Sequence, residues 1–150
     1  MISYCTDRTQ IIRLWRQAFG DSTDDINFFI DNVKDAQCLA YYEGDTAVSM
    51  MYLVKCVANG RQANYIYAAC TLDDFKGKGF MTKLINFCRS SCMTVCLIPA
   101  SDSLVEYYSA RGISHKIPIE SLVFEQIPEI EEYLFEGYNL SRPAALISEE

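Results

Sequence analysis

The sequence has little positive charge and little histidine. It has 13 lysines and arginines against 20 aspartates and glutamates, giving a formal net charge of −7, and histidine occurs once. This acidic balance argues against general nucleic-acid binding, because that function relies on broad positive surfaces. It still allows a small basic site for a phosphorylated ligand.

The sequence also lacks long apolar runs. No run approaches the roughly 18 residues that a membrane helix needs. The first ten residues, MISYCTDRTQ, lack the basic start and apolar core of a signal peptide. Seven cysteines are present, but their number is odd and most lie within apolar runs, so we expect reduced, buried thiols rather than disulfides. We therefore expect a cytoplasmic protein with no membrane segment.

What is present is the composition of a globular protein. Half of the 150 residues are apolar and 22% are charged, far from the signature of disorder. The length suits one domain, and there is no internal repeat or low-complexity linker. We expect a single domain over residues 1–150, with its core at 37–127 and a tail of uncertain structure at 128–150.

Hydrophobic periodicity predicts two helices, then a sheet with further helices. In order, we expect helices at 7–19 and 21–33, antiparallel strands at 37–43, 46–58 and 61–71, a helix at 80–92, a strand within 93–100, a helix at 103–112 that opens on a Ser103/Glu106 capping box, a mostly extended segment at 113–127 and a short helix within 129–138. The passage from the third strand through the next helix should form a right-handed parallel β-α-β unit. These elements predict an α/β (α+β) fold, with a mixed twisted sheet flanked by helices.

The stretch FKGKGFMTKL, at 75–84, joins the third strand to that helix. It is not a nucleotide P-loop, because Phe80 follows Gly79 where lysine is required. It is not the dinucleotide fingerprint either, since Thr82 replaces the last glycine. A helix N-terminus with two glycines and two lysines nevertheless suits an anion, because it offers unpaired N–H groups and allows close approach. From these residues alone, a phosphate site and a solvated loop remain equal alternatives.

The run K-G-K-G-F-M, at 76–81, resembles the (Q/R)-x-x-G-x-(G/A) signature of the GNAT superfamily of acetyl-CoA-dependent N-acetyltransferases. Lys76 and Gly79 carry the match, and Met81 stands where that family has glycine or alanine. The context is also similar: the strand YIYAACT precedes the run, and Tyr108 lies four residues before Gly112. Within the superfamily, FKGKGFMTKLI and LIPASDSLVEYYSARGI resemble the broad-specificity, enhanced-intracellular-survival-like branch.

The resemblance implies a GNAT acyl-CoA N-acyltransferase fold and a direct transfer of acetyl from acetyl-CoA, the acyl-donor co-substrate, to a primary amine. It implies that Tyr108 is the general acid for the coenzyme A thiolate, although a core aromatic is the alternative. It also implies which residues bind the coenzyme: Ala69, Cys70, Thr71, Lys76, Gly77, Lys78, Gly79, Phe80, Met81 and Thr82. The bulk of Met81 is expected to point away from the pyrophosphate, and Tyr107 is expected to face elsewhere than Tyr108.

No general base is evident from the sequence. Asp73 and Asp74 would repel phosphates and are expected to face solvent, and Glu43 ends a strand beside a turn. His115 is the only side chain with an unperturbed pKa near neutrality, but a structural or surface role is the more common one for such a histidine.

Several other groups admit two interpretations. Cys88, Cys92 and Cys96 have helical spacing for a metal, but the helix should stop near Cys92, so we expect no metal site. Cys70 could carry an acyl group, although packing is the simpler role. The tyrosines of the expected sheet fit either an amine pocket or cross-strand packing: they are Tyr41, Tyr42, Tyr52, Tyr65 and Tyr67.

The expected partner is a small-molecule or peptide amine, and neither nucleic acid nor a membrane is expected. A homodimer is left open. The competing hypothesis is a non-catalytic module of the same fold that binds coenzyme A or another protein.

Overall fold

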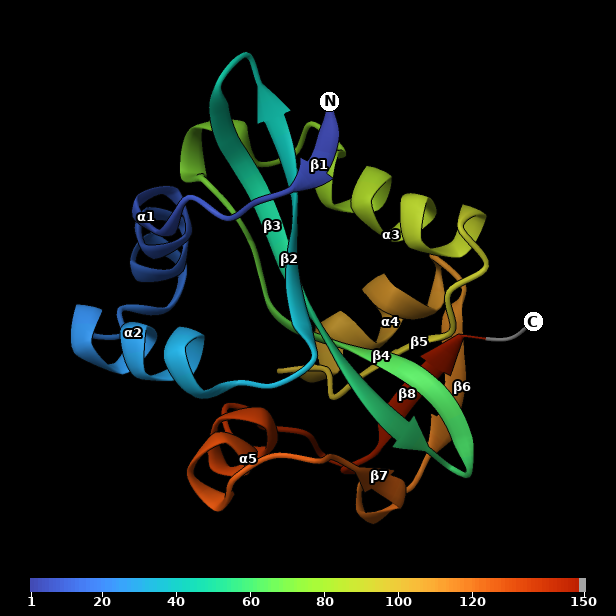
Figure 1. Ribbon diagram of the computed structural model, residues 1–150. Coiled ribbons are helices and arrows are strands. Elements are labelled where there is room, and N and C mark those ends of the chain that lie inside the picture. Colours follow the sequence, from blue (N-terminus) through green and yellow to red (C-terminus); the bar gives the residue numbers. More distant parts are fainter. Residues whose placement is uncertain (149–150) are drawn as a thin grey trace.

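The computed structural model describes residues 1–148. Within them, eight strands form one mixed sheet with the order β1-β2-β3-β4-β5-β8-β6, and β7 pairs with β3. The strands are β1 (Ile2–Tyr4), β2 (Ala36–Glu43), β3 (Thr46–Ala58), β4 (Arg61–Thr71), β5 (Val95–Leu97), β6 (Ile113–Ile117), β7 (Leu122–Val123) and β8 (Ala145–Ser148). The helices are α1 (Arg8–Phe19), α2 (Thr23–Asn32), α3 (Phe80–Ser90), α4 (Asp102–Ser109) and α5 (Pro128–Phe135), with 3₁₀ turns at Asp73–Phe75 and Ile119–Ser121. The expected mixed sheet flanked by helices is confirmed (Figure 1).

Local sequence signals explain the first two helices. The Asp7 carboxylate accepts a hydrogen bond from the Thr9 N–H at 3.1 Å at the start of α1, and the Ser22 hydroxyl accepts one from the Asp25 N–H at 3.1 Å at the start of α2. Gly20 ends α1 in the left-handed conformation, with φ of 73°. Side-chain acceptors at the start and glycine after the end are the expected caps of an α-helix.

The strand meander and the crossover also follow the sequence. Strands β2, β3 and β4 pair antiparallel. Asn59 and Gly60 both have positive φ, 50° and 80°, as a tight hairpin turn requires. Strand β5 pairs parallel to β4 after α3, which confirms the β-α-β unit.

Three local expectations were wrong. Helix α4 begins at Asp102 with Ser101 as its N-cap residue, so Ser103 and Glu106 do not form a capping box. The segment 113–127 is mostly not strand, because Pro118 precedes a 3₁₀ turn after β6 and only the short β7 follows. Strand β1, too short to show periodicity, was not expected and pairs with β2.

The tail completes the sheet. Helix α5 confirms the short helix expected there. Strand β8, from a segment whose structure was uncertain, lies between β5 and β6, and all four of its residues are buried. Strands β5 and β6 are therefore joined through β8, which lies close to the end of the described residues.

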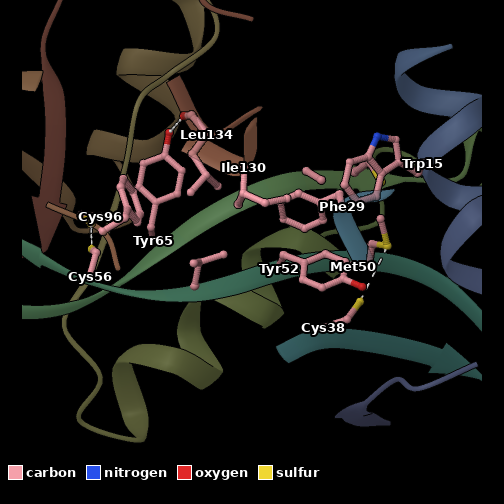
Figure 2. Close-up of a cluster of buried hydrophobic side chains, with 14 of the residues drawn as sticks. Trp15, Phe29, Cys38, Met50, Tyr52, Cys56, Tyr65, Cys96, Ile130 and Leu134 are labelled. Atoms are coloured by element: carbon pink, nitrogen blue, oxygen red, sulfur yellow. Dashed lines mark hydrogen bonds between the residues drawn. The ribbon is translucent and has the colours of Figure 1, made fainter. Parts of the chain in front are cut away.

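Two hydrophobic clusters cover the opposite faces of the sheet. The first lies under α1, α2 and α5 and includes Trp15, Phe29 and Tyr52 (Figure 2). The Trp15 ring packs edge-on against Phe29 and Tyr52, with ring centroids 5.3 and 5.9 Å apart. The second cluster lies under α3 and α4 and includes Leu84, Ile85 and Tyr108. Figure 2 also shows the Tyr65 hydroxyl donating to the Leu134 carbonyl at 2.6 Å, a bond that ties β4 to α5.

Candidate active site

The site is built around the point where β4 and β5 part. Their parallel pairing covers only Asn64 with Val95 and Tyr65 with Cys96. Beyond it, β4 carries a bulge: the register with β3 shifts between Met50 and Tyr52, and Ala68 has a φ of 53°. A bulge bends its strand and re-aims the following residues. The end of β4 still pairs with β3 at Cys70 and Thr71, while its other edge has no strand beside it among the described residues.

A cavity of about 580 Å³ lies beside this end of β4. It is lined by the last residues of β4, by the loop before α3, by the first turn of α3 and by α4. The residues that the sequence placed at the coenzyme all line it except Lys78: they are Ala69, Cys70, Thr71, Lys76, Gly77, Gly79, Phe80, Met81 and Thr82. The Lys78 ammonium instead lies 5.1 Å from the centre of the Phe75 ring.

The loop conformation explains its two glycines. Gly77 and Gly79 have φ values of 77° and 81°, and Gly79 is the N-cap residue of α3. A Cβ added at either would meet no atom within 4 Å, so it is the left-handed backbone, not crowding by other residues, that demands glycine. The first turn of α3 lines the cavity, and the first N–H groups of a helix have no partner within the helix.

Arg111 is a cavity residue that the sequence did not reveal. Its guanidinium carbon lies 3.6 Å from the centre of the Tyr107 ring, and its Nε donates to the Thr82 hydroxyl at 2.8 Å. A second donor contacts the Tyr107 carbonyl at 2.8 Å. Tyr107 also lines this cavity, contrary to the expectation that it faces elsewhere. No spacing signal marks a lone arginine after a helix, so only the fold places this cation beside the loop.

The charged residues before the glycines lie at the surface. Asp73 and Asp74 are exposed, as expected, and the Asp73 carboxylate pairs with Lys76 at 3.0 Å. An anion in the cavity would therefore compete with Asp73 for Lys76, at little cost because exposed ion pairs contribute about 0–1 kcal/mol. Met81, by contrast, lines the cavity with a partly buried side chain that packs against the second hydrophobic cluster.

A second cavity, of about 380 Å³, lies on the side of α1 and α5. Its lining includes Trp15 and Phe19 of α1, Tyr65 and Tyr67 of β4, and Tyr133 of α5. Tyr41, Tyr42 and Tyr52 are not part of the lining, so only two of the sheet tyrosines in question reach it. Three residues line both cavities: Ala69, Leu104 and Tyr108. The two cavities therefore border each other along these residues, beside the point where β4 and β5 part.

Tyr108 stands at this junction. Its side chain is 8% exposed, and burial, with a smaller effect of Tyr107, raises its pKa to about 12. The phenol therefore keeps its proton throughout the neutral range. A protonated hydroxyl at the meeting point of two cavities can donate a hydrogen bond or a proton to a group that becomes negative there.

The residues considered as a base lie elsewhere. Asp73, Asp74, Glu43 and His115 line neither cavity, and His115 sits exposed on β6 opposite Ile147. The carboxylates that line the second cavity are Asp21, between α1 and α2, and Glu136, after α5. Asp21 and Glu136 had no distinguishing sequence pattern, because each lies in a turn among several other acidic residues.

The cysteines are free thiols, and all but Cys92 are buried. Burial raises the pKa of Cys70 to about 12, so its thiol is protonated and a poor nucleophile at neutral pH. Cys88 belongs to one hydrophobic cluster and Cys96 to the other. The three cysteines with helical spacing therefore do not share a face.

Comparison with known proteins identifies the fold. No family model and no curated protein matches the sequence. Among solved structures, an acetyltransferase of Bacillus subtilis in complex with coenzyme A has a TM-score of 0.62 at 15% identity, over 99% of this chain and 97% of that one. Glucosamine-6-phosphate N-acetyltransferase of Arabidopsis thaliana has a TM-score of 0.58 at 18% identity, over 78% of this chain and 92% of that one. The fold is that of the GNAT acetyltransferases.

The GNAT fold is also shared with longer proteins. A probable N-acyltransferase of Enterococcus faecalis has a TM-score of 0.57 at 14% identity, over 75% of this chain but only 31% of that one. This chain thus spans less than a third of the length of that protein. Identities this low establish the GNAT fold itself and leave activity to be argued from the site. Within residues 1–148, no helix combines the length and apolarity required for a membrane span.

Proposed function

We propose that this protein is an acetyl-CoA-dependent N-acetyltransferase that moves acetyl directly to a primary amine. One observation carries the proposal: a basic, glycine-lined cavity and an aromatic cavity meet at a buried, protonated tyrosine. Such a junction suits a reaction between two substrates that approach from opposite faces of the sheet.

The residues present fit coenzyme A. Lys76 and Arg111 provide positive charge, and the start of α3 provides backbone N–H groups for phosphates. Beyond the pairing with β5, the end of β4 at Ala69, Cys70 and Thr71 provides an edge along which an extended arm can lie. When bound, acetyl-CoA supplies a thioester carbonyl that an amine attacks while the sulfur leaves as a thiolate.

This chain's own groups then act at defined places. In the proposal, a backbone N–H near Ala69 or Cys70 stabilises the charge that develops on the carbonyl oxygen. The Tyr108 hydroxyl donates to the leaving sulfur. The attacking nitrogen loses its proton to water that reaches it from the second cavity.

The sequence supports a finer assignment within the superfamily. We assign the protein to the broad-specificity, enhanced-intracellular-survival-like branch on the runs FKGKGFMTKLI and LIPASDSLVEYYSARGI. We further propose an amine as the partner, a cytoplasmic location and no binding to membranes. We also propose that the protein does not bind nucleic acid, because its net charge of −7 disfavours contact with phosphates. Size measurement in solution tests whether the chain forms a homodimer.

Thermal unfolding with acetyl-CoA, followed by thiol release with a panel of amines, tests the proposed function. A ligand at a hundred times its Kd should stabilise the protein by about 2.7 kcal/mol. Amine-dependent thiol release should follow, with the acetylated amine detected by mass. No stabilisation at millimolar acetyl-CoA would contradict the proposal, and stabilisation without transfer to any amine would favour a non-catalytic coenzyme A-binding module.

A further inference from the structure

The second cavity has a lining that is specific in charge and shape. It reaches the junction at Tyr108 from the side of α1 and α5, and its volume of about 380 Å³ suits a small molecule. Apolar and aromatic side chains form most of its walls, while Asp21 and Glu136 are the carboxylates that it contains. No lysine or arginine contributes to the lining as the described residues define it.

Asp21 is held in place by an aromatic residue. The Trp15 indole N–H donates to the Asp21 carboxylate at 2.9 Å, and Trp15 itself is 1% exposed. A single N–H leaves most of the acceptor positions of an ionised carboxylate available. Asp21 is exposed, and this hydrogen bond restrains its carboxylate beside the cavity.

Glu136, also exposed, enters the same lining from the end of α5. It is the C-cap residue of α5, where the last carbonyls of the helix add a negative potential. The Tyr65 hydroxyl already occupies the Leu134 carbonyl at 2.6 Å. A cation beside Glu136 would be favoured by its carboxylate and by the other carbonyls at the end of the helix.

Aromatic rings form part of the same lining. The Tyr67 ring packs against Trp15 and Phe29, with centroids 5.7 and 5.1 Å apart. The Tyr133 hydroxyl donates to the Asp25 carbonyl at 3.0 Å, which fixes its ring. Faces of tyrosine and tryptophan attract cations, by about 0.5–1 kcal/mol at exposed sites and more when water is excluded.

The pKa values of Tyr67 and Tyr133 reflect the negative charge around this cavity. Burial, followed by the charges of Asp21 and Glu136, raises the pKa of Tyr67. Burial raises the pKa of Tyr133 as well, with Asp25, Asp21 and Glu136 adding to it. Both carboxylates therefore act on groups inside the cavity, which makes its interior favourable for positive charge.

We infer that the acceptor is a small diamine or polyamine, whose second ammonium group is held between Asp21, Glu136 and the aromatic walls. The inference rests on the proposed function. The attacking amine must be neutral, whereas a second alkyl ammonium with an ordinary pKa of about 10.4 stays charged at neutral pH. Only an acceptor with such a second charge uses all the features of this cavity.

Two amines of similar length test the inference. We would measure kcat/KM for 1,4-diaminobutane and for pentylamine, which replaces the second ammonium by a methyl group, at saturating acetyl-CoA. The diamine should be preferred at least tenfold. The double variant Asp21→Asn, Glu136→Gln should bring the ratio close to one, mainly through a higher KM for the diamine.

A matched control separates the cavity charges from net charge. Asp24 and Glu132 are exposed and lie outside the cavity, and the variant Asp24→Asn, Glu132→Gln changes the net charge by the same amount. It should keep the tenfold preference. Stabilisation by acetyl-CoA should be equal in all three proteins, which shows that the variants fold.

The outcomes separate the two proposals. Equal use of both amines by the unaltered protein, or a preference that survives Asp21→Asn, Glu136→Gln, would overturn the acceptor assignment and leave the acetyltransferase proposal intact. Acetyl-CoA binding without transfer to any amine would overturn both. The loss of preference in the control variant as well would show that overall charge, not the cavity, selects the acceptor.

Discussion

Replacing Tyr108 by phenylalanine removes one hydroxyl from the junction of the two cavities. Phenylalanine keeps the ring that packs in the cluster under α3 and α4, where Tyr108 is 8% exposed. Coenzyme binding should therefore change little. Any large effect on turnover must come from the hydroxyl itself.

The structure sets the size of the expected effect. Full proton transfer from a phenol with a pKa of about 12 to a thiolate with an ordinary pKa of about 8.5 is uphill by about 3.5 pKa units, or roughly 5 kcal/mol. Donation of a hydrogen bond to the developing thiolate does not carry this cost. Such a bond to a charged group contributes about 1.5–3 kcal/mol, so Tyr108→Phe should lower kcat by roughly 10- to 150-fold.

The assay is amine-dependent thiol release at saturating acetyl-CoA, with stabilisation by acetyl-CoA measured in parallel. Tyr4→Phe is the control, because Tyr4 is 40% exposed on β1 and lines neither cavity. Its kcat should equal that of the unaltered protein. A kcat for Tyr108→Phe within twofold of the control would refute the role given to the hydroxyl.

Four further predictions concern the coenzyme loop and the stability of the fold. Arg111→Met should raise the Kd for coenzyme A about tenfold in calorimetry, because a charge-assisted contact to phosphate contributes about 1.5–3 kcal/mol. An unchanged Kd would show that Arg111 does not contact the coenzyme. Gly79→Ala should lower the free energy of unfolding by about 1–2 kcal/mol in urea titrations, because its φ of 81° is strained for alanine. Raising the pH from 8 to 10 should also lower the free energy of unfolding. Burial raises the pKa of Cys70 to about 12 and that of Cys88 to about 11, so these thiols lose their protons at lower pH in the unfolded chain than in the folded one. Above about pH 9, each thiol should therefore lower the free energy of unfolding by up to about 1.4 kcal/mol per pH unit. Removing residues 144–150 should lower the free energy of unfolding by roughly 3–6 kcal/mol in the same titrations. The truncation deletes the buried side chains of Leu146 and Ile147 in β8.

The lining of the first cavity could largely be predicted from the sequence because most of its residues are close together in the chain. Gly77, Gly79 and the start of α3 lie within one short run that closely follows the end of β4. The second cavity could not be predicted in the same way. Its carboxylates, Asp21 and Glu136, are 115 residues apart in the chain and have no partner nearby in sequence that marks them as special.

The sequence by itself determined most of the order of helices and strands, the caps of α1 and α2, the hairpin turn at Asn59-Gly60 and the loop before α3, because backbone preferences and periodicity act over a few residues. The tertiary structure alone decided that β8 lies inside the sheet, that β4 and β5 part after two pairs, and that Tyr108 stands where two cavities meet. These features depend on strand pairing and packing between distant segments, and a strand as short as β8 carries no local signal of its place in the sheet.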